Sequence, residues 1–480
     1  MKSLARAIIL TTLVATSSGP AYADPFDHQW CRYPTARYDF ISDLSQSKVM
    51  ELAEQMEVFR QSVQPFIHGD HEFEELQIKV VIFRDADDFA SVLATPHFSG
   101  FMQPSLRQNL LVISPGQENR WLTENTLHEY THYLLRNRLD VRIPTWYDEG
   151  LASLLSTAAI GRRDVTLGKA PKRLIRKALR GEALSLQQVL DTEVLFELDL
   201  PELNDLYLTS WALMHYISLG THQTKQLESY LRSTDAGLNE ALGTTNEELD
   251  AQLSKYLQRA RLPRIQLPKP AIHLEPVEAQ CLTDIERDRE LAMLMLYHKE
   301  TAALALLQQL HEQEPENVDL LLSLSRAYAR LDNSNEALQF AELAHSLDRD
   351  HPGAKISVAL NLTQSCMFKR VGGCNAKWRR AAELLESGLR QAPQRFDAEL
   401  GLGVAYLHRN SPEEAVTHLR RAYERAPWAP HINLYLGECY RLLGDPRARG
   451  LLTNALNWAT MDLTKRLATS ALSQLNEVDE

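Results

Sequence analysis

The sequence predicts an α+β domain followed by an all-α solenoid, and two observations separate these parts. Over residues 24–261, short β-branched or apolar segments alternate with helical patterns, as in an α+β domain. Over residues 283–480, helical patterns follow one another without strands, and prolines punctuate them at similar intervals, as in a solenoid of helix pairs. We expect a linker over residues 262–282, where prolines are frequent and no periodicity is present.

The first 23 residues are expected to be a secretory signal peptide rather than part of the fold. Lys2 and Arg6 precede the short apolar run 7–15, and Ala21–Ala23 is the small-residue ending typical of a cleavage site. A membrane anchor is the alternative, but the apolar run is too short to span a bilayer. Cleavage after Ala23 predicts a protein outside the cytoplasm, periplasmic or secreted, with no membrane span in the remaining chain.

The composition is that of a globular chain with an acidic balance. The 480 residues are 44% hydrophobic and 24% charged, and the formal net charge is −12. Nucleic-acid binding needs clustered Lys and Arg side chains that neutralise phosphates. The acidic balance therefore argues against DNA or RNA as a partner.

Four of the five cysteines can form two disulfides in an oxidising compartment. Cys366 and Cys374 are the favoured pair because they close one short loop, and Cys31 with Cys281 would tie the N-terminal segment to the linker. Cys439 lies in a helical pattern and is expected to be a buried thiol. The sequence alone leaves this pairing open.

The elements of the first domain follow from periodicity and capping signals. Strands are predicted at residues 37–42, 76–83 and 109–113, and helices at 45–63, from Asp85, and at about 118–136. After Pro144, further helices are predicted from Glu149 and at about 170–180, 203–219 and 245–261.

The helix predicted at 118–136 contains the pattern H-E-x-x-H. The four-residue step from His128 to His132 places both imidazoles on one helix face, where they can bind one zinc ion. A catalytic zinc needs a third protein ligand and an open position, and Glu149 is the candidate. Asp148 could coordinate instead, but neighbouring helical residues point about 100° apart, so only one of the two can face the histidines.

The surroundings of the motif resemble those of the gluzincin metallopeptidases, in which W-x-x-E-G-x-A follows H-E-x-x-H on the next helix. The residues that match this second pattern are Trp146, Glu149, Gly150 and Ala152. The resemblance covers roughly residues 30–260. It implies a zincin-like metallopeptidase domain.

The resemblance also implies roles for individual residues. His128, His132 and Glu149 would hold one zinc ion, and Glu129 would be the general base that takes a proton from the attacking water. The segment 207–212 resembles the Y-x-x-G/S-x-A segment of aminopeptidase-type gluzincins, so the Tyr207 hydroxyl would stabilise the oxyanion. The alternative for Tyr207 is a packing role on an amphipathic helix.

Two further residues bear on this interpretation. His215 lies two turns after Tyr207 and is expected to be structural rather than catalytic. Aminopeptidases of this kind carry G-x-M-E-N before the zinc motif, and this chain has Gly100-Phe101-Met102-Gln103-Pro104 instead. A neutral Gln103 cannot pair ionically with the α-ammonium group of a substrate, so the sequence favours an endopeptidase. The alternative is a fortuitous match.

The second part of the chain resembles tetratricopeptide (TPR) repeats. Prolines recur at intervals of 37, 41 and 34 residues at positions 315, 352, 393 and 427. One unit has the consensus residues at their expected offsets: Leu402, Gly403, Tyr406, Ala415, Leu419, Ala422 and Pro427. We expect four or five units, whose groove would bind peptides or protein segments; the alternative is that the repeats only brace the first domain.

These features predict an extracytoplasmic zinc metallopeptidase that acts on protein or peptide substrates, which the TPR repeats would bind or position. The alternative is a TPR interaction or scaffold protein whose zincin-like domain has little activity. The intact Glu129 argues against the alternative, because a site without turnover needs no base. A zinc hydrolase acting on a non-peptide bond is a third possibility.

Overall fold

The computed structural model describes most of the chain. The predicted signal peptide and much of the segment predicted as a helix at 170–180 lie outside the described residues. No described helix is long and apolar enough to cross a membrane. The described residues are 25–67, 77–93, 100–103, 105–115, 124–136, 143–171, 176, 186–191, 200–232, 237–259, 261–367, 374–459 and 461–479.

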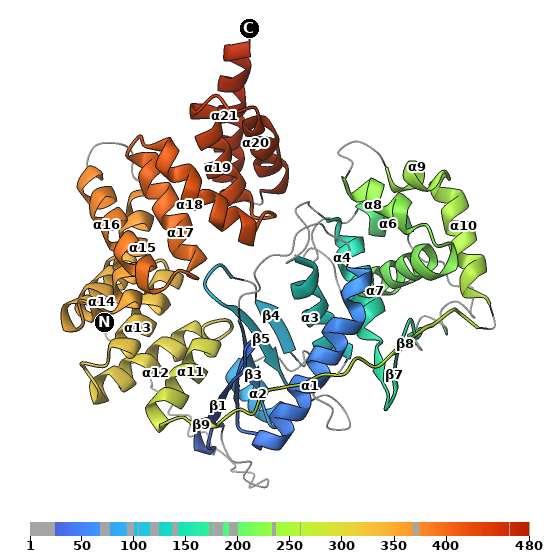
Figure 1. Cartoon of the computed structure of the whole chain (residues 1–480), viewed down its shortest axis with the longest axis horizontal. Helices are drawn as coiled ribbons and strands as arrows, with labels where there is room; N and C mark the ends of the chain where they lie inside the picture. Colours follow the sequence, from blue (N-terminus) through green and yellow to red (C-terminus); the bar gives the residue numbers. More distant parts are fainter. Residues whose placement is uncertain are drawn as a thin grey trace, which may run out of the picture.

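A six-stranded mixed sheet forms the centre of the first domain (Figure 1). Its strand order is β4-β5-β3-β2-β1-β9, with β2, β3 and β5 parallel and the other pairs antiparallel. The three parallel strands correspond to the three predicted ones. The strands are β1 (Cys31–Pro34), β2 (Tyr38–Ser42), β3 (Ile78–Ile82), β4 (Gly100–Gln103), β5 (Asn109–Ile113) and β9 (Gln280–Cys281).

Helices α1 and α3 cover one face of this sheet. α1 (Gln46–Val63) matches the predicted helix, and α3 (Glu124–Arg136) carries the H-E-x-x-H motif. Phe40, Val80 and Leu111 from the sheet share one buried cluster with both helices. The start predicted for the motif helix, near residue 118, lies outside the described residues.

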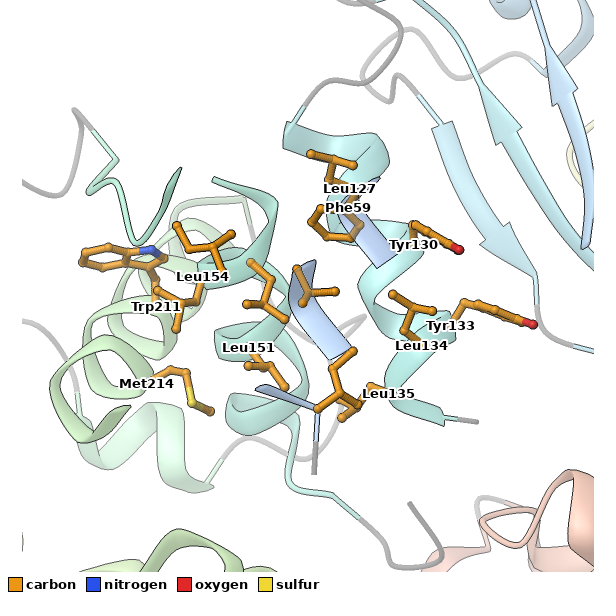
Figure 2. Packing of buried hydrophobic residues seen from close by; sticks show 14 of the residues in the cluster. Phe59, Leu127, Tyr130, Tyr133, Leu134, Leu135, Leu151, Leu154, Trp211 and Met214 are labelled. Atoms are coloured by element: carbon orange, nitrogen blue, oxygen red, sulfur yellow. The ribbon is translucent and has the colours of Figure 1, made fainter. Parts of the chain in front are cut away.

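Three helices pack together around the motif (Figure 2). α4 (Thr145–Ser156) lies beside α3, and α7 (Leu200–His215) lies beside α4 and continues as a π-helix over Tyr216–Gly220. The helix predicted at 203–219 therefore corresponds to α7 and this extension. Among the labelled side chains, Phe59 comes from α1, and Tyr130 and Tyr133 point from α3 towards the sheet. The other labelled side chains of the cluster are Leu127, Leu134, Leu135, Leu151, Leu154, Trp211 and Met214.

Short elements complete the first domain. α10 corresponds to the predicted helix at 245–261, and Thr245 with Glu248 forms its capping box. α8 and α9 were not predicted, because each is short and followed by a loop. These elements are α2 (Ala86–Leu93), α6 (Leu186–Asp191), α8 (Thr224–Arg232), α9 (Leu238–Leu242), α10 (Asn246–Leu257), β6 (Ala159–Ile160), β7 (Asp164–Leu167) and β8 (Ile265–Pro268).

The segment 262–282, where we expected a linker, is an extended strap. It runs across α1 from β8, which pairs with β7, to β9, which pairs with β1 (Figure 1). Gln46 on α1 donates a hydrogen bond to the carbonyl of Val277 at 2.6 Å. An extended strap has no helical period, which explains the lack of periodicity in this segment.

The second domain is a stack of helix pairs from α11 to α21, which matches the predicted solenoid (Figure 1). In the consensus unit, a Cβ at Gly403 would lie 2.5 Å from the Leu419 side chain, so the small residue allows close packing. Pro352 follows α14, as expected, and is also the first residue of α15, because proline is tolerated in the first turn of a helix. The helices are α11 (Asp284–Met295), α12 (Glu300–Gln313), α13 (Val318–Arg330), α14 (Ser334–Leu347), α15 (Pro352–Met367), α16 (Asn375–Gln391), α17 (Phe396–His408), α18 (Pro412–Arg425), α19 (Pro430–Leu442), α20 (Arg447–Trp458) and α21 (Asp462–Asp479).

The solenoid packs directly on the second face of the sheet. Val81, Leu110 and Val112 point to this face and share a buried cluster with Leu291 of α11 and Leu320 of α13. Lys79 of β3 also pairs with Glu290 of α11. The two domains therefore share a core.

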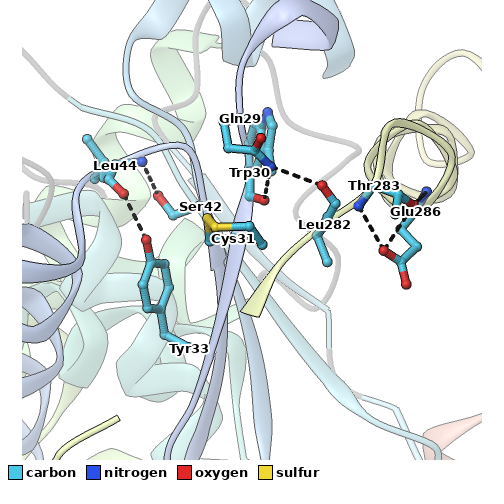
Figure 3. The surroundings of a disulfide bond; sticks show 10 residues. Gln29, Trp30, Cys31, Tyr33, Ser42, Leu44, Leu282, Thr283 and Glu286 are labelled. Atoms are coloured by element: carbon cyan, nitrogen blue, oxygen red, sulfur yellow. Dashed lines mark hydrogen bonds between the residues drawn. A yellow bond between two sulfur atoms is a disulfide. The ribbon is translucent and has the colours of Figure 1, made fainter. Parts of the chain in front are cut away.

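Both disulfides form as proposed, and Cys439 is a buried free thiol. Cys31 and Cys281 are directly opposite in the antiparallel pair of β1 and β9. Figure 3 shows that Gln29 donates a hydrogen bond to the carbonyl of Leu282, next to this bond. The disulfide thus fixes the strap where it leaves the first domain.

Candidate metal centre

Helices α3 and α4 supply the three predicted zinc ligands. The two histidines lie one turn apart on α3, on the side that faces α4. α4 begins at Thr145, one turn before the predicted start at Glu149, and the buried ring of Trp146 anchors that turn. Glu149 is therefore held by a regular helix rather than by a loop.

The ligand atoms of the three residues face one another. Nε2 of His128 lies 2.9 Å from Oε2 of Glu149 and 3.1 Å from Nε2 of His132. Nε2 of His132 lies 3.5 Å from the same carboxylate oxygen. Two imidazole nitrogens and a carboxylate oxygen around a tetrahedral zinc ion are about 3.3 Å apart. The chemistry and spacing of this donor set fit a zinc ion.

Asp148 lies behind His132 rather than among the ligand atoms. Its Oδ1 accepts a hydrogen bond from Nδ1 of His132 at 2.5 Å. This bond fixes the tautomer in which Nε2 keeps its lone pair for a metal ion. Of the two neighbouring acids, Glu149 faces the histidine Nε2 atoms and Asp148 orients a ring.

The charges of the centre favour a bound cation. Burial alone would lower the pKa of His132, but Asp148 and Glu149 outweigh burial and raise it to about 10. Burial alone would raise the pKa of Glu149, but its hydrogen bonds with His128 and His132 hold that pKa well below the ordinary value. Glu149 is therefore a carboxylate, and a metal ion would displace a proton from His132.

Glu129 lies between the motif helix and the edge of the sheet. Its Oε2 accepts a hydrogen bond from the backbone N–H of Met102 on β4 at 3.3 Å. Among the described residues, β4 pairs with β5 alone and so is an edge strand. A carboxylate beside both the metal ligands and an open strand edge is placed to act on a chain bound along that edge.

Tyr207 of α7 also reaches the centre. Its ring lies edge-on to that of His128, with 5.8 Å between the ring centroids. Burial, together with the charges of Glu149 and Glu129, raises the pKa of Tyr207 well above its ordinary value. The hydroxyl is therefore a proton donor over the whole physiological range.

Two other residues singled out in the sequence lie elsewhere. His215 is fully buried, with Nδ1 2.8 Å from the Tyr256 hydroxyl and Nε2 3.2 Å from the carbonyls of Gly168 and Pro263. This environment is structural, as expected. Gln103 is the exposed last residue of β4, and Pro104 lies outside the described residues.

Sequence reasoning missed the roles of Asp148 and of the Met102 N–H. The role of Asp148 could have been predicted, because neighbouring helical residues point about 100° apart. When Glu149 faces Nε2 of the histidines, Asp148 points elsewhere and can still reach Nδ1 of His132. The hydrogen bond from the Met102 N–H to Glu129 has no sequence signal, because its donor is a backbone group that every residue type except proline carries. Also missed was a second group of possible ligands, His28, Asp43 and Asp88, which no motif spacing connects.

An apolar cavity of about 320 Å³ lies on the opposite face of α4 from Glu149. Tyr147, Leu151, Leu154 and Leu155 line it from α4, at helical spacing. None of the three zinc-ligand candidates lines it. We therefore do not assign the cavity to the metal centre.

Comparison with known proteins identifies the repeats of the second domain. The tetratricopeptide repeat family matches residues 294–357 and 375–430. TPR repeats therefore occupy the C-terminal region, and such repeats generally mediate protein–protein interaction. Both matches lie beyond the metal centre and carry no information about it.

One curated relative matches part of the chain. The mouse (Mus musculus) interferon-induced protein with tetratricopeptide repeats 2 is 27% identical over 137 residues, which are 28% of this chain and 27% of that protein. This chain thus spans about a quarter of the length of that relative.

Solved TPR structures are more distant. A thermophilic TPR protein from Thermus thermophilus is 22% identical, covering 39% of this chain and 98% of its own, with a TM-score of 0.31. MamA residues 41-end from Desulfovibrio magneticus RS-1 is 19% identical, covering 36% of this chain and 94% of its own, with a TM-score of 0.30. These scores are too low to support an argument about function.

Proposed function

We propose that this chain is a protein-binding TPR protein whose first domain is a zinc-dependent peptidase of the zincin type, acting outside the cytoplasm. The observation that carries the proposal is the convergence of Nε2 of His128, Nε2 of His132 and Oε2 of Glu149 in one buried position. The comparisons support the protein-binding part alone.

The residues around the donor set suit peptide hydrolysis. A zinc ion bound there would polarise a water molecule and the carbonyl of a peptide. Glu129 adjoins His128 on α3 and would accept the proton of the water, then deliver it to the leaving amine. Tyr207, held as a neutral phenol, would donate a hydrogen bond to the developing oxyanion. Asp148 would keep His132 in its binding tautomer.

The edge strand β4 suggests how a protein substrate would bind. An extended chain can add to an open sheet edge through main-chain hydrogen bonds, without a dedicated pocket. The Met102 N–H contacts Glu129, so a chain along β4 would pass next to the base. This geometry favours an endopeptidase acting on unfolded segments.

The second candidate function is an interaction or scaffold protein with a weakly active or inactive zincin-like domain. The comparisons favour it, because they recognise the repeats and give no sign of peptidase activity. In that case the metal ion would stabilise the fold. The presence of Glu129 and Tyr207 next to the donor set favours catalysis instead.

Metal content and proteolysis of the full chain separate the two functions. We expect His128→Ala to lose the zinc ion of this centre, and Glu129→Gln to keep it while cleavage of an unfolded protein falls about 10²–10⁴-fold, as for loss of a general base. Glu124→Gln, an exposed acid on the same helix, is the matched control and should retain full activity.

A different result would reject the peptidase. If the parent chain binds zinc but cleaves neither an unfolded protein nor any member of a peptide library, the scaffold function stands. If cleavage persists in Glu129→Gln, the assignment of the base is wrong. A pull-down with Glu129→Gln should enrich unfolded substrates if the chain is a peptidase and should not do so if it is a scaffold.

A further inference from the structure

Three side chains from distant parts of the sequence meet near the start of the described chain. His28 follows the short helix Pro25–Asp27, Asp43 follows β2, and Asp88 lies on α2. Nδ1 of His28 lies 2.9 Å from Oδ2 of Asp43 and 3.3 Å from Oδ2 of Asp88. The candidate zinc centre, on the other side of the sheet, shares none of these residues.

The donors of this cluster are buried. The side chains of His28, Asp43 and Asp88 are 11%, 1% and 4% exposed. Water therefore has little access to the two carboxylates, and their charge must be balanced by groups of the protein or by a ligand.

Two carboxylate oxygens in the cluster lack a hydrogen-bond donor among the described residues. They are Oδ1 of Asp43 and Oδ2 of Asp88, and both are fully buried. The Asp88 carboxylate points at His28, at a distance longer than a hydrogen bond of good geometry. Buried carboxylate oxygens are normally satisfied, so the unsatisfied Oδ2 of Asp88, which faces the same ring nitrogen of His28 as Oδ2 of Asp43, indicates a missing partner.

The spacing of the donors identifies the kind of partner. The three ligand atoms lie within 4.8 Å of one another. The distances from Nδ1 of His28 to the two carboxylate oxygens, 2.9 and 3.3 Å, resemble the 2.9 and 3.1 Å from Nε2 of His128 to its two partners in the first centre. Imidazole nitrogen is a ligand for transition metals and carboxylate oxygen for harder ions. A set of one imidazole nitrogen and two carboxylate oxygens suits a first-row divalent ion such as Zn²⁺ or Mn²⁺.

We propose that His28, Asp43 and Asp88 form a second metal site, which binds one divalent transition-metal ion and has a structural role. The ion joins the N-terminal segment, the end of β2 and α2. These three parts meet next to the solenoid, where Arg287 of α11 donates to the carbonyl of His28 at 3.5 Å. Metal binding therefore secures the N-terminal segment at the junction of the two domains.

A basic side chain belongs to the same network. Nε of Arg84 lies 3.4 Å from Oδ2 of Asp43, but this side chain is 47% exposed and can turn towards solvent when an ion binds. The competing explanation is that His28 is protonated and, with Arg84, balances the two aspartates without a metal. The two explanations differ in whether the purified chain binds a metal ion here.

The test uses the full chain with the first centre removed by His128→Ala and His132→Ala. After chelation, refilling with Zn²⁺ or Mn²⁺ and gel filtration, we expect one equivalent of metal per chain by mass spectrometry. Adding Asp88→Asn should abolish this binding, whereas Asp87→Asn, an exposed neighbour on α2, should leave it unchanged. Added metal should raise the midpoint of thermal unfolding of the Asp87→Asn variant but not that of the Asp88→Asn variant.

Several outcomes would overturn the proposal. If the variant with His128→Ala and His132→Ala folds but binds no metal, then His28, Asp43 and Asp88 form an ion-pair network rather than a metal site. Metal that remains in Asp88→Asn would show binding elsewhere. Where the altered first centre prevents folding, the parent chain gives the answer: it should hold two equivalents, and Asp88→Asn or Asp43→Asn should hold one. Retention of the same number of equivalents in both variants would reject the site.

Discussion

At the scale of single residues, two buried histidines of the first domain show how the environment sets protonation. His132 lies between two carboxylates, and its pKa is raised to about 10 in spite of burial. His215 has a hydroxyl and two carbonyls as partners, and burial lowers its pKa to about 4. The sequence predicted the pair of His128 and His132 from spacing, whereas the neutral state of His215 depends on residues 41 to 48 positions away.

The neutral His215 predicts a fall in stability on acidification. Its folded-state pKa of about 4 lies below the ordinary value of about 6.5, so below pH 6.5 the unfolded chain binds a proton that the folded chain does not. This effect lowers the free energy of unfolding by about 3 kcal/mol as the pH falls from about 6.5 to about 4. In His215→Gln this contribution is absent.

The measurement is the gap between the thermal unfolding midpoints of the parent and His215→Gln. The gap should be largest at pH 7, where the variant has lost the buried hydrogen bonds, and should narrow towards pH 4.5. His273→Gln, at a side chain that is 90% exposed, should follow the parent at every pH. A constant gap for His215→Gln would contradict the assigned neutral state.

At the scale of helices and strands, the sequence predicted what local pattern encodes. α1, α7 and α10 have long periodic faces or clear caps, and were placed correctly. β1, β4 and β9 have two to four residues and exist because a distant strand pairs with them, which a local pattern does not contain. The overlooked β4 is the strand that contacts Glu129, so the missing element was also part of the candidate site.

The contact between α4 and α7 predicts that Gly150 cannot carry a side chain. A Cβ at Gly150 would lie 2.6 Å from the carbonyl oxygen of Ser210, which is a backbone atom of α7. The two helices would have to separate, so we expect Gly150→Ala to cost about 1–3 kcal/mol of unfolding free energy. Because Glu149 precedes this residue, the affinity for zinc at the first centre should also fall.

Gly450→Ala is the matched control for Gly150→Ala. Gly450 lies on α20, and a methyl group added there would have no atom within 4 Å, so the same substitution should be neutral or stabilise by about 0.5–1 kcal/mol. Chemical unfolding and zinc titration of both variants check the prediction. If Gly150→Ala leaves the free energy of unfolding unchanged, α4 and α7 can separate at little cost, and the prediction is wrong.

At the scale of the whole molecule, the sequence predicted two domains but not their shared core. The signal was present, since β3 is apolar at consecutive positions from Val80 to Ile82, and a strand that is apolar on both sides requires cover on both faces. α1 and α3 cover one face. Which helices cover the other cannot be read from composition, because every helix of the solenoid has an apolar side.

The shared core predicts that the first domain is not soluble without the first repeats. A chain that ends at residue 282 exposes Val81, Phe83, Leu110 and Val112, which share a buried cluster with residues of α11 and α13 in the full chain. An exposed apolar sheet face of this kind favours association. We expect this fragment to aggregate or to bind a hydrophobic dye in gel filtration and fluorescence assays.

A chain that ends at residue 349 provides the control. It keeps α11, α12 and α13, whose residues share the buried cluster with the sheet, and it ends after α14, at a boundary between repeats. The later repeats contact the first domain at Leu106, between β4 and β5, which packs against the buried cluster of Ala426 and Ile432. Their loss uncovers this loop rather than the face of the sheet, so we expect a monomer with little dye binding. A monomeric, cooperatively unfolding fragment ending at 282 would instead show that the repeats are an appended module, and that the sheet does not depend on them.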